Sequence, residues 1–328
     1  MRREASQSKS AARLAGGGER GTGAPSRVQC FMRGVRKAFR SPQFWFAAAV
    51  LVPIMSWYLV FSFGPILRAF PLALQHYLIL DPRKSPFIGW RNFHSLFADP
   101  VFLTAVKNTA TWAVLGFTLQ LPLCLFVSVC LANVSRRRSL YQAMIFLPRV
   151  ISLVAIALLF LMLMDPEVGQ INRILRSLGL PQPRWLADSK TALFSCVLIG
   201  TWKGYGYYVV ILTAGLLNIP EELYDAAKVD GVNEWQRFWR VTLPLLGHTL
   251  LLVTVVMAIG LLQVFTSPFV LTQGGPGTAT YTYNMLLSEE AFVKMRFGAA
   301  AAAALLQFAV ILVLSLFQLK VLRPAWSY

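Results

Sequence analysis

The chain has 328 residues, of which 56% are hydrophobic and only 14% are charged, with 31 Lys and Arg residues against 14 Asp and Glu residues. An average soluble domain has about 25% charged residues, so one water-soluble core is excluded for so apolar a chain. The net charge of +17 would suggest nucleic acid in a soluble protein. Basic loops also orient membrane proteins, so the sequence predicts a membrane protein that binds no nucleic acid.

Residues 1–43 form a polar, basic tail in front of the first apolar stretch. Residues 1–30 are rich in Ser, Gly, Ala and Arg, which predicts disorder. The first apolar stretch is too long and too late in the chain for a cleavable signal peptide. Residues 30–40 alternate apolar and basic side chains, a pattern typical both of a short helix on the inner leaflet and of a plain basic flank. Both interpretations stay open.

Six later stretches are long enough to cross a bilayer, which requires about 20 apolar residues. They are Phe44–Leu67, Asn108–Ala132, Tyr141–Met164, Thr191–Leu217, Leu243–Leu271 and Phe297–Leu319. The alternating pattern of a membrane β-barrel is missing. The predicted fold class is therefore all-α, a polytopic membrane protein with six transmembrane helices. Its predicted parts are the tail 1–43, a transmembrane domain 44–320 and a short tail 321–328.

An even number of spans places both termini on the same side of the membrane. Arg33, Arg36, Lys37 and Arg40 stand directly before the first span. Basic residues close to the first span favour the cytoplasmic side. The sequence therefore predicts that both termini are cytoplasmic.

The sequence lacks the residues of several reaction classes. All carboxylates lie outside the six stretches, which argues against a proton- or sodium-driven carrier. The patterns GxxxxGK[ST], HExxH and GxSxG are missing, and the four cysteines and three histidines have no metal-ligand spacing. We therefore expect no catalytic residue, no metal and no enzyme activity in this chain. Any work that it does takes its energy from another subunit.

The loop 219–244, between the fourth and fifth spans, predicts two short helices. Pro220 suits the first turn of a helix, and Glu221 favours its positive end. Gly231 can adopt the left-handed conformation that ends a helix. Asn233 can cap a second helix that runs to Arg240.

One face of the first predicted helix carries Leu223, Ala226, Ala227 and Asp230, at helical spacing. Its small central residues would let another protein approach closely. The pattern alone is equally typical of an amphipathic helix that rests on the membrane.

The loop resembles the EAA loop of the membrane subunits of ABC importers. That motif is Glu-Ala-Ala, three residues, Gly, nine residues, Ile, one residue and Leu-Pro. The matching positions here are Asp225, Ala226, Ala227, Gly231, Val241, Leu243 and Pro244. Asp replaces Glu and Val replaces Ile, and all spacings are kept.

Four other segments are similar to the carbohydrate branch of these permeases: Phe146–Pro148, Trp202–Tyr205, Ala214–Pro220 and Leu271–Gly277. Within that branch the chain looks like the first of two paired permeases, as in maltodextrin and glycerol-phosphate importers. The extra N-terminal spans and the large external insertion of the maltodextrin subunit have no counterpart here.

The resemblance implies a type I importer permease of the inner membrane whose loop 219–244, the coupling loop, docks on a cytoplasmic ATPase. The implied coupling residues are Glu221, Asp225, Ala226, Ala227, Gly231, Leu243 and Pro244. The implied partners are a second, homologous permease, two copies of the ATPase and an external solute-binding protein. ATP and Mg²⁺ would be used by the ATPase, so we expect no cofactor in this chain. The implied function is import of a carbohydrate, in particular an oligosaccharide, by alternating access. The alternative is a self-contained channel or facilitator for a polar solute.

Aromatic and hydrogen-bonding side chains in the spans are candidates for the substrate path. They are Arg149, Lys203, Tyr205, Tyr208, Gln263, Phe265 and Asn284. Arg149 and Lys203 are cations within spans, and such charges usually face a cavity or a partner charge. One interpretation is that they favour an acidic oligosaccharide. The other is that Lys203 is a structural feature of the family and that Arg149 extends to the headgroups.

Overall fold

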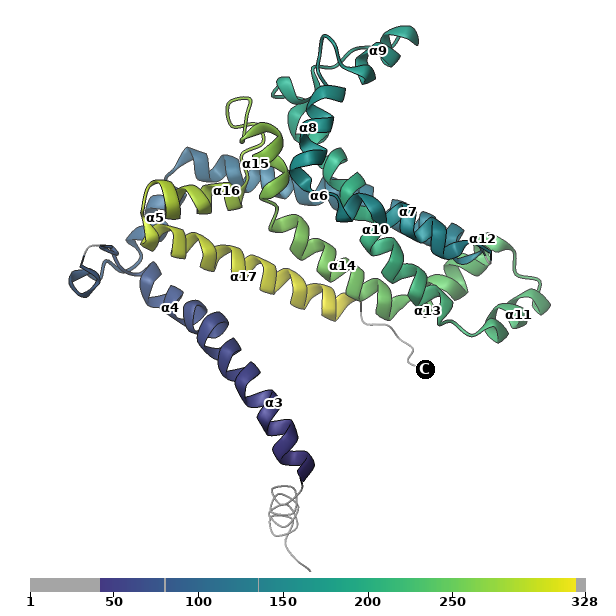
Figure 1. The fold of residues 1–328 in the computed structure, drawn as a ribbon, viewed down its shortest axis with the longest axis horizontal. Helices are drawn as coiled ribbons and strands as arrows, with labels where there is room; N and C mark the ends of the chain where they lie inside the picture. The colour runs from purple at the N-terminus through teal and green to yellow at the C-terminus, as the bar shows by residue number, and fades with distance from the viewer. Residues whose placement is uncertain (1–41, 80, 135, 323–328) are drawn as a thin grey trace, which may run out of the picture. The chain divides into compact units, whose positions relative to one another are not determined.

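The computed structural model of the chain describes residues 42–79, 81–134 and 136–322 (Figure 1). Within these ranges the regular structure is helical, and the only extended pairing is an isolated bridge between Gln75 and Phe87. The chain divides into two compact units, with the boundary between Ile66 and Leu67. The expected disordered tail, the candidate helix at 30–40 and its basic cluster lie outside the described residues. The division into tail, transmembrane domain and short tail stays a prediction.

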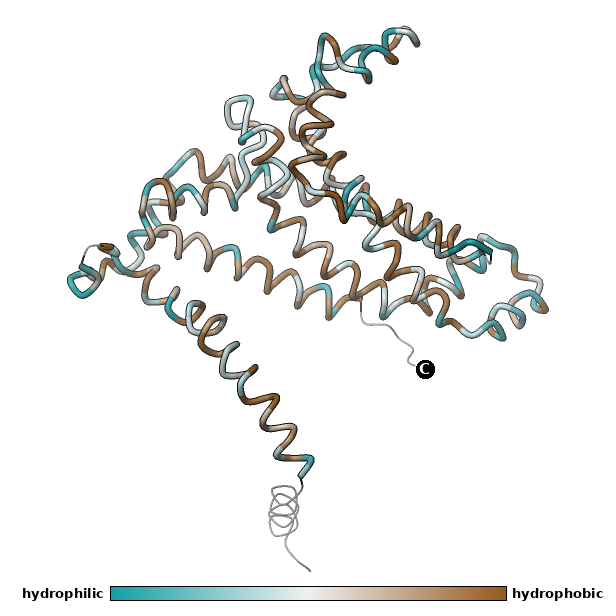
Figure 2. The backbone as a smooth tube through the Cα atoms, viewed as in Figure 1, coloured by the Kyte–Doolittle hydropathy of each residue, from teal (hydrophilic) through white to brown (hydrophobic). Residues whose placement is uncertain are grey.

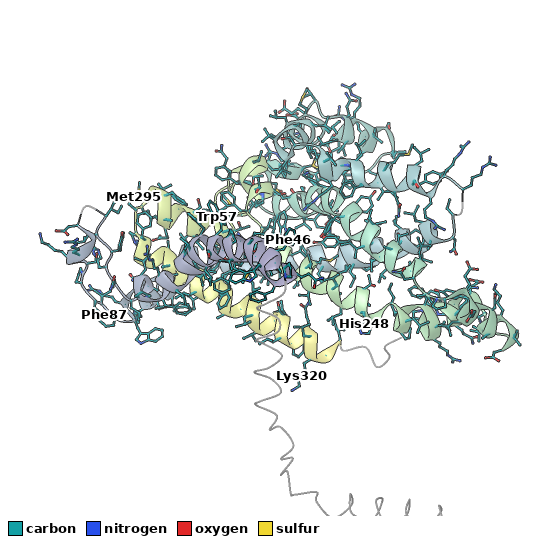
Figure 3. The ribbon with its side chains drawn as sticks, turned by 60° about the horizontal axis from the view of Figure 1, so that its bottom comes forward. Phe46, Trp57, Phe87, His248, Met295 and Lys320 are labelled. Carbon is teal, nitrogen blue, oxygen red and sulfur yellow. The ribbon has the colours of Figure 1, made fainter. Side chains whose placement is uncertain are left out.

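The described residues of the first unit, 42–66, lie in the helix that contains the first predicted span. Helix α3 (Pro42–Tyr58) continues through the π-helical turn η1 (Leu59–Phe63) into α4 (Gly64–Ala73), which crosses the unit boundary. Together they form a helix of 32 residues that is long and apolar enough to cross a membrane. Phe46 and Trp57 are labelled in Figure 3, and both side chains are largely exposed within this chain. Such a surface suits lipid or another helix.

The second unit contains the other predicted spans and the loops that join them. Its elements in chain order are η2 (Pro82–Lys84), α5 (Arg91–Phe97), α6 (Pro100–Ala132), α7 (Arg138–Val150), α8 (Leu153–Leu163), α9 (Gln170–Ser177), η3 (Trp185–Ala187), α10 (Ala192–Leu217), α11 (Glu221–Val229), α12 (Glu234–Arg237), η4 (Phe238–Thr242), α13 (Leu243–Leu245), α14 (Gly247–Leu262), α15 (Thr266–Thr272), α16 (Tyr283–Ser288), η5 (Glu289–Val293) and α17 (Phe297–Val321). Figure 2 shows long hydrophobic stretches along α8, α14 and α17, and hydrophilic residues gathered at α9 and around α11 and α12.

Two of the six predicted spans are not single helices. The third is divided into α7 and α8, which meet at an angle of 89°, and the fifth is divided at Leu246, where the axis turns by 73°. The fifth is interrupted again between α14 and α15, at Gln263. The apolar stretches predicted where these spans lie and gave no sign of the breaks. The reason is that hydropathy indicates whether a segment lies in lipid or in water, and does not indicate where its backbone bends.

By length and composition, three of the described helices can each cross a membrane, and up to five spans result if each bent pair counts as one. The three are Pro42–Ala73, α6 and α17. The fourth predicted span corresponds to α10, whose 26 residues are long enough to cross. Its centre is less apolar because it contains Lys203, two glycines and three tyrosines between residues 203 and 208. The count of six spans stays a prediction.

Helices α6, α10 and α14 form the centre of the second unit. Cys124, Val209 and Met257, one from each helix, belong to a cluster that is fully buried. Lipid tails are as apolar as leucine, so such helices are held by close packing and by hydrogen bonds between them. Ser128 of α6 donates to its own helix at Cys124 (2.6 Å) and to Val209 of α10 (3.3 Å).

Close backbone contact also joins α10 to α7. A Cβ atom added at Gly206 would collide with the carbonyl oxygen of Ile145, so only glycine fits at this crossing. Helices α14 and α17 also pack together, and Figure 3 labels His248 near the start of α14 and Lys320 near the end of α17, at the same end of the pair. The two helices are therefore antiparallel.

An ion cluster joins η5 to the start of α17. The carboxylate of Glu290 is 1% exposed and lies 3.0 Å from Lys294 Nζ and 3.1 Å from Arg296 Nε. The neighbouring Glu289 accepts a hydrogen bond of 2.5 Å from the Tyr281 hydroxyl and pairs with Lys294. The hydrogen bond from Tyr281 holds the pKa of Glu289 below its ordinary value, and the bond to Glu290 raises the pKa of Lys294. Within the cluster each carboxylate therefore has a donor.

Candidate coupling loop and substrate path

The turn between α11 and α12 has the geometry that the sequence predicts. Gly231 has a φ of +71°. Its N–H donates to Lys228 O (3.1 Å), and the N–H of Val232 donates to Ala227 O (3.1 Å). This pair of bonds is the Schellman motif, in which a left-handed residue satisfies the last carbonyls of a helix. The predicted left-handed conformation of Gly231 is confirmed, and its role in coupling stays a prediction.

The start of α12 is also as expected. The side chain of Asn233 accepts from the N–H of Gln236 (2.8 Å), and the Gln236 side chain accepts from the N–H of Asn233 (3.3 Å). The two bonds form a capping box. The second helix is longer than predicted, because α12, η4 and α13 continue it to Leu245.

One predicted coupling residue faces inward. Ala227 is only 7% exposed, whereas Asp225 and Ala226 are exposed and Val229 is 88% exposed. The small-residue face that a partner can reach is therefore narrower than the periodicity suggests. The side chain of Ala227 is instead turned toward the rest of the chain.

Side-chain contacts hold the two helices of the loop together. The guanidinium of Arg237 lies 5.7 Å from the centre of the Tyr224 ring and also pairs with Glu234. Lys228 pairs with Asp225 at 2.9 Å within α11. Arg237 connects α12 to α11 through a cation–π contact, so the hairpin has its own internal support.

A cavity of about 470 Å³ separates this hairpin from the ends of α6 and α10. Charged residues of the hairpin line it, among them Glu221, Asp225 and Arg237, together with Ala132 of α6 and Leu216 of α10. Leu243 and Pro244 belong to α13, directly before the 73° bend. Ile219, at the start of the loop, belongs to the buried cluster of α6, α10 and α14, and Tyr224 of α11 packs against the same cluster, so the cavity lies beside these contacts.

The predicted substrate residues fall into three places. Lys203 and Arg149 lie at the junction of α7, α8 and α10. The Lys203 Nζ donates to the carbonyl oxygens of Pro148 (3.2 Å), Arg149 (3.2 Å) and Ile151 (2.8 Å). The guanidinium of Arg149 lies 5.6 Å from the centre of the Tyr207 ring.

The other candidates are divided between the core and the break in the fifth span. Tyr205 and Tyr208 pack partly buried against the cluster of α6, α10 and α14. Gln263 directly follows α14 and is exposed. Phe265 stacks on Phe269 with ring centres 5.1 Å apart. Asn284 lies half-buried on α16.

A family model described as "Binding-protein-dependent transport system inner membrane component" matches residues 120–327. The chain belongs to this family. The match covers the coupling loop and every predicted substrate residue. Membership makes the chain an inner membrane component of a transport system, with a type I importer permease fold.

Relatives and solved structures of this family extend the match to most of the chain. YurN of Bacillus subtilis (strain 168), named a probable ABC transporter permease protein, is 35% identical over 274 residues, 82% of this chain and 93% of its own. The arabinooligosaccharides transport system permease protein AraP of Halalkalibacterium halodurans is 30% identical over 82% of this chain and 85% of its own. A crystal structure of a bacterial ABC transporter involved in the import of the acidic polysaccharide alginate has a similar chain, with a TM-score of 0.75 and 26% identity over 87% of this chain and 97% of its own.

Two polar residues that form hydrogen bonds between segments were not predicted from the sequence. Asn108 of α6 donates to Thr278 O (2.8 Å) and Tyr281 O (3.0 Å), and Gln307 of α17 donates to Leu262 O (3.1 Å). Gln307 thereby satisfies a carbonyl at the end of α14, directly before the break at Gln263. A single amide in an apolar span was the available signal, because such residues usually bond between helices.

Proposed function

We propose that this chain is one of two paired permease subunits of an ABC importer for an oligosaccharide, with both termini in the cytoplasm. The observation that carries the proposal is the coupling loop, a helical hairpin whose first helix exposes Asp225, Ala226 and Val229. The family membership and the names of the relatives support it, since one transports arabinooligosaccharides and a similar structure imports alginate.

In this proposal the chain works by alternating access and binds no nucleotide. ATP closes a dimer of the partner ATPase, α11 moves with it, and the paired permeases open outward to a substrate-loaded binding protein. The binding protein is supported by a second alginate structure, solved in complex with an alginate pentasaccharide-bound periplasmic protein. A second homologous permease and two ATPase copies complete the complex, and the ATPase uses ATP and Mg²⁺.

The relatives point to two substrate classes, neutral and acidic oligosaccharides. The test is ATP hydrolysis by the reconstituted complex of all subunits, measured with binding protein and a panel that contains both classes. We expect hydrolysis to rise with one class of oligosaccharide. The chain alone in liposomes should neither hydrolyse ATP nor pass sugar. Sugar flux through the chain alone would favour a self-contained facilitator, and a complex that no oligosaccharide stimulates would contradict the proposal.

A further inference from the structure

The junction of α7 and α8 is a helix break inside a predicted membrane span. Helix α7 ends at Val150, Ile151 is extended (φ −64°, ψ 139°), and α8 begins at Leu153. The axes of the two helices differ by 89°. A helix end leaves about four carbonyl groups without a partner in the helix. At membrane depth such groups need a partner, either a protein group or water in a cavity, because lipid tails offer none.

Lys203 is that neighbour. Its ammonium reaches across from α10 and donates to the carbonyls of Pro148, Arg149 and Ile151, at 3.2, 3.2 and 2.8 Å. The first two carbonyls belong to the last turn of α7, and the third belongs to the residue after it. The C-terminus of a helix carries partial negative charge, so a cation is favoured there. The Lys203 ammonium therefore satisfies carbonyls that the helix break leaves without a partner, and these carbonyls in turn stabilise its charge.

The same geometry leaves the ammonium little capacity for a substrate. A lysine ammonium has three N–H donors and no acceptor. Three backbone carbonyls accept from Lys203. A substrate carboxylate would have to displace at least one of them and leave a carbonyl unpaired in the membrane. This geometry favours the structural interpretation of Lys203 over the acidic-substrate interpretation.

Two further contacts fix the end of α7 on α10. Gly206 allows the backbone of α10 to touch the carbonyl of Ile145. One turn along α10 from Lys203, the Tyr207 ring lies under the guanidinium of Arg149. Helix α10 then runs without a break to Leu217, only four residues before α11 begins at Glu221. From Lys203 to Leu217 the helix covers about 21 Å.

We propose that Lys203 is a positioning residue that fixes the broken third span to α10, so that the junction of α7 and α8 moves together with the coupling helix α11. This inference rests on the proposed function for its transport consequence. Its structural part concerns only contacts of this chain and can be measured separately.

The experiment compares Lys203→Met, Lys203→Arg and the control Lys107→Met in the complete complex. Lys107 is exposed on α6, which makes it a matched lysine-to-methionine change outside the junction. Amide hydrogen exchange at residues 147–156 reports the junction, and uptake of a neutral and an acidic oligosaccharide reports transport. We expect Lys203→Met, which removes all three bonds, to speed exchange at the junction by about tenfold or more, since losing even one charge-assisted hydrogen bond has about that effect.

Transport by Lys203→Met should fall for neutral and acidic oligosaccharides alike. The fall should appear in the maximal rate and not in the half-saturating concentration, because the ammonium does not touch substrate. Lys203→Arg, which keeps a charged donor, should restore most of both signals, and Lys107→Met should match wild type. If Lys203→Met does not assemble, Lys203→Gln, which keeps an N–H donor without the charge, replaces it and should give an intermediate effect.

Three results would overturn the proposal: unchanged exchange at the junction, loss of only the acidic substrate, or an arginine variant that assembles but transports no better than the methionine variant. A wild-type complex that transports no oligosaccharide would instead contradict the proposed function. The exchange measurement at the junction would still decide the role of Lys203.

Discussion

Gly231 and Asn233 determine where the coupling loop turns, because one ends α11 and the other starts α12 two residues later. Gly231 has a positive φ, and a Cβ atom added to it would meet no other atom within 4 Å. Glycine is therefore needed for its backbone conformation and not for space. A side chain at this position changes only the cost of the left-handed turn.

Because glycine is needed here only for its backbone conformation, the effect of Gly231→Ala can be predicted. The left-handed conformation costs a residue with a Cβ atom about 1 kcal/mol, which corresponds to about a fivefold change in an equilibrium constant. We expect amide exchange in residues 221–232 to quicken by about that factor, with the membrane helices unchanged. Gly231→Asn should give a smaller effect, since asparagine tolerates this conformation better. Equal exchange in wild type and Gly231→Ala would show that the turn does not limit opening of α11.

The neighbouring alanines 226 and 227 predict opposite results for the same substitution. Ala226 is exposed, so Ala226→Trp should leave the chain folded and abolish its association with the ATPase, because the ring blocks close approach. Ala227 is 7% exposed, so Ala227→Trp should lower the thermal stability of the chain itself. Co-purification with the ATPase and thermal unfolding separate the two effects. The control is Ala98→Trp at an exposed position after α5, and normal ATPase association by Ala226→Trp would contradict this docking surface.

At the scale of helices, local signals in the sequence were sufficient for the coupling loop and insufficient for the broken spans. A glycine at C′ and an asparagine at an N-cap act within four residues of themselves, so the end of α11 and the start of α12 were predictable. Lys203 and its three carbonyl partners are 52 to 55 residues apart. A pattern within one span does not reach residues that far away in the sequence. The role of Lys203 could therefore not be predicted from its own span.

The inward position of Ala227 was missed for a related reason. Periodicity groups Leu223, Ala226, Ala227 and Asp230 on one face. It does not say which edge of that face is turned toward the rest of the chain. The contact between Arg237 and Tyr224, which joins α12 to α11, fixes that rotation. Only the folded hairpin shows it.

The ion cluster of η5 and α17 predicts a pH dependence at the scale of an element. Because the pKa of Glu289 is lowered from 4.5, its contribution to stability is present above that value and is lost as the pH falls through the folded pKa. The pKa of Lys294 is raised from 10.5, so its contribution is present below that value and is lost as the pH rises through the folded pKa. Between these limits the cluster is fully paired.

The variant Glu289→Gln tests the predicted loss of stability at low pH. We expect the variant to unfold about a degree or two below wild type at neutral pH, a small effect because the pair is partly exposed. The difference should shrink as the pH falls through the lowered pKa of Glu289, because the wild-type carboxylate then becomes neutral as well. Thermal unfolding of the purified chain across this pH range provides the measurement, with the exposed Glu167→Gln as control. A difference that persists unchanged at low pH would assign the effect of the variant to packing and not to charge.

At the scale of the whole molecule, the proposed orientation gives each polar segment a side of the membrane. The coupling hairpin and the end of α17 would face the cytoplasm, while α9 and the ion cluster would face outward. The hydropathy of the chain agrees with such a division, since hydrophilic stretches lie at α9 and around α11 and α12, with apolar helices between them (Figure 2). Hydropathy does not by itself say which side is which.

Cysteine labelling with a membrane-impermeant maleimide determines the orientation. Leu178 follows α9 and is 65% exposed, Val229 ends α11 and is 88% exposed, and Lys320 lies in the exposed last turn of α17. In a background with Cys30→Ser and Cys130→Ser, the buried Cys124 and Cys196 remain as unreactive thiols. We expect Leu178→Cys to react in intact spheroplasts. Val229→Cys and Lys320→Cys should react only after the membrane is opened, because the coupling loop must share a side with ATP. The reverse pattern would place the loop outside the cell and would contradict docking on a cytoplasmic ATPase.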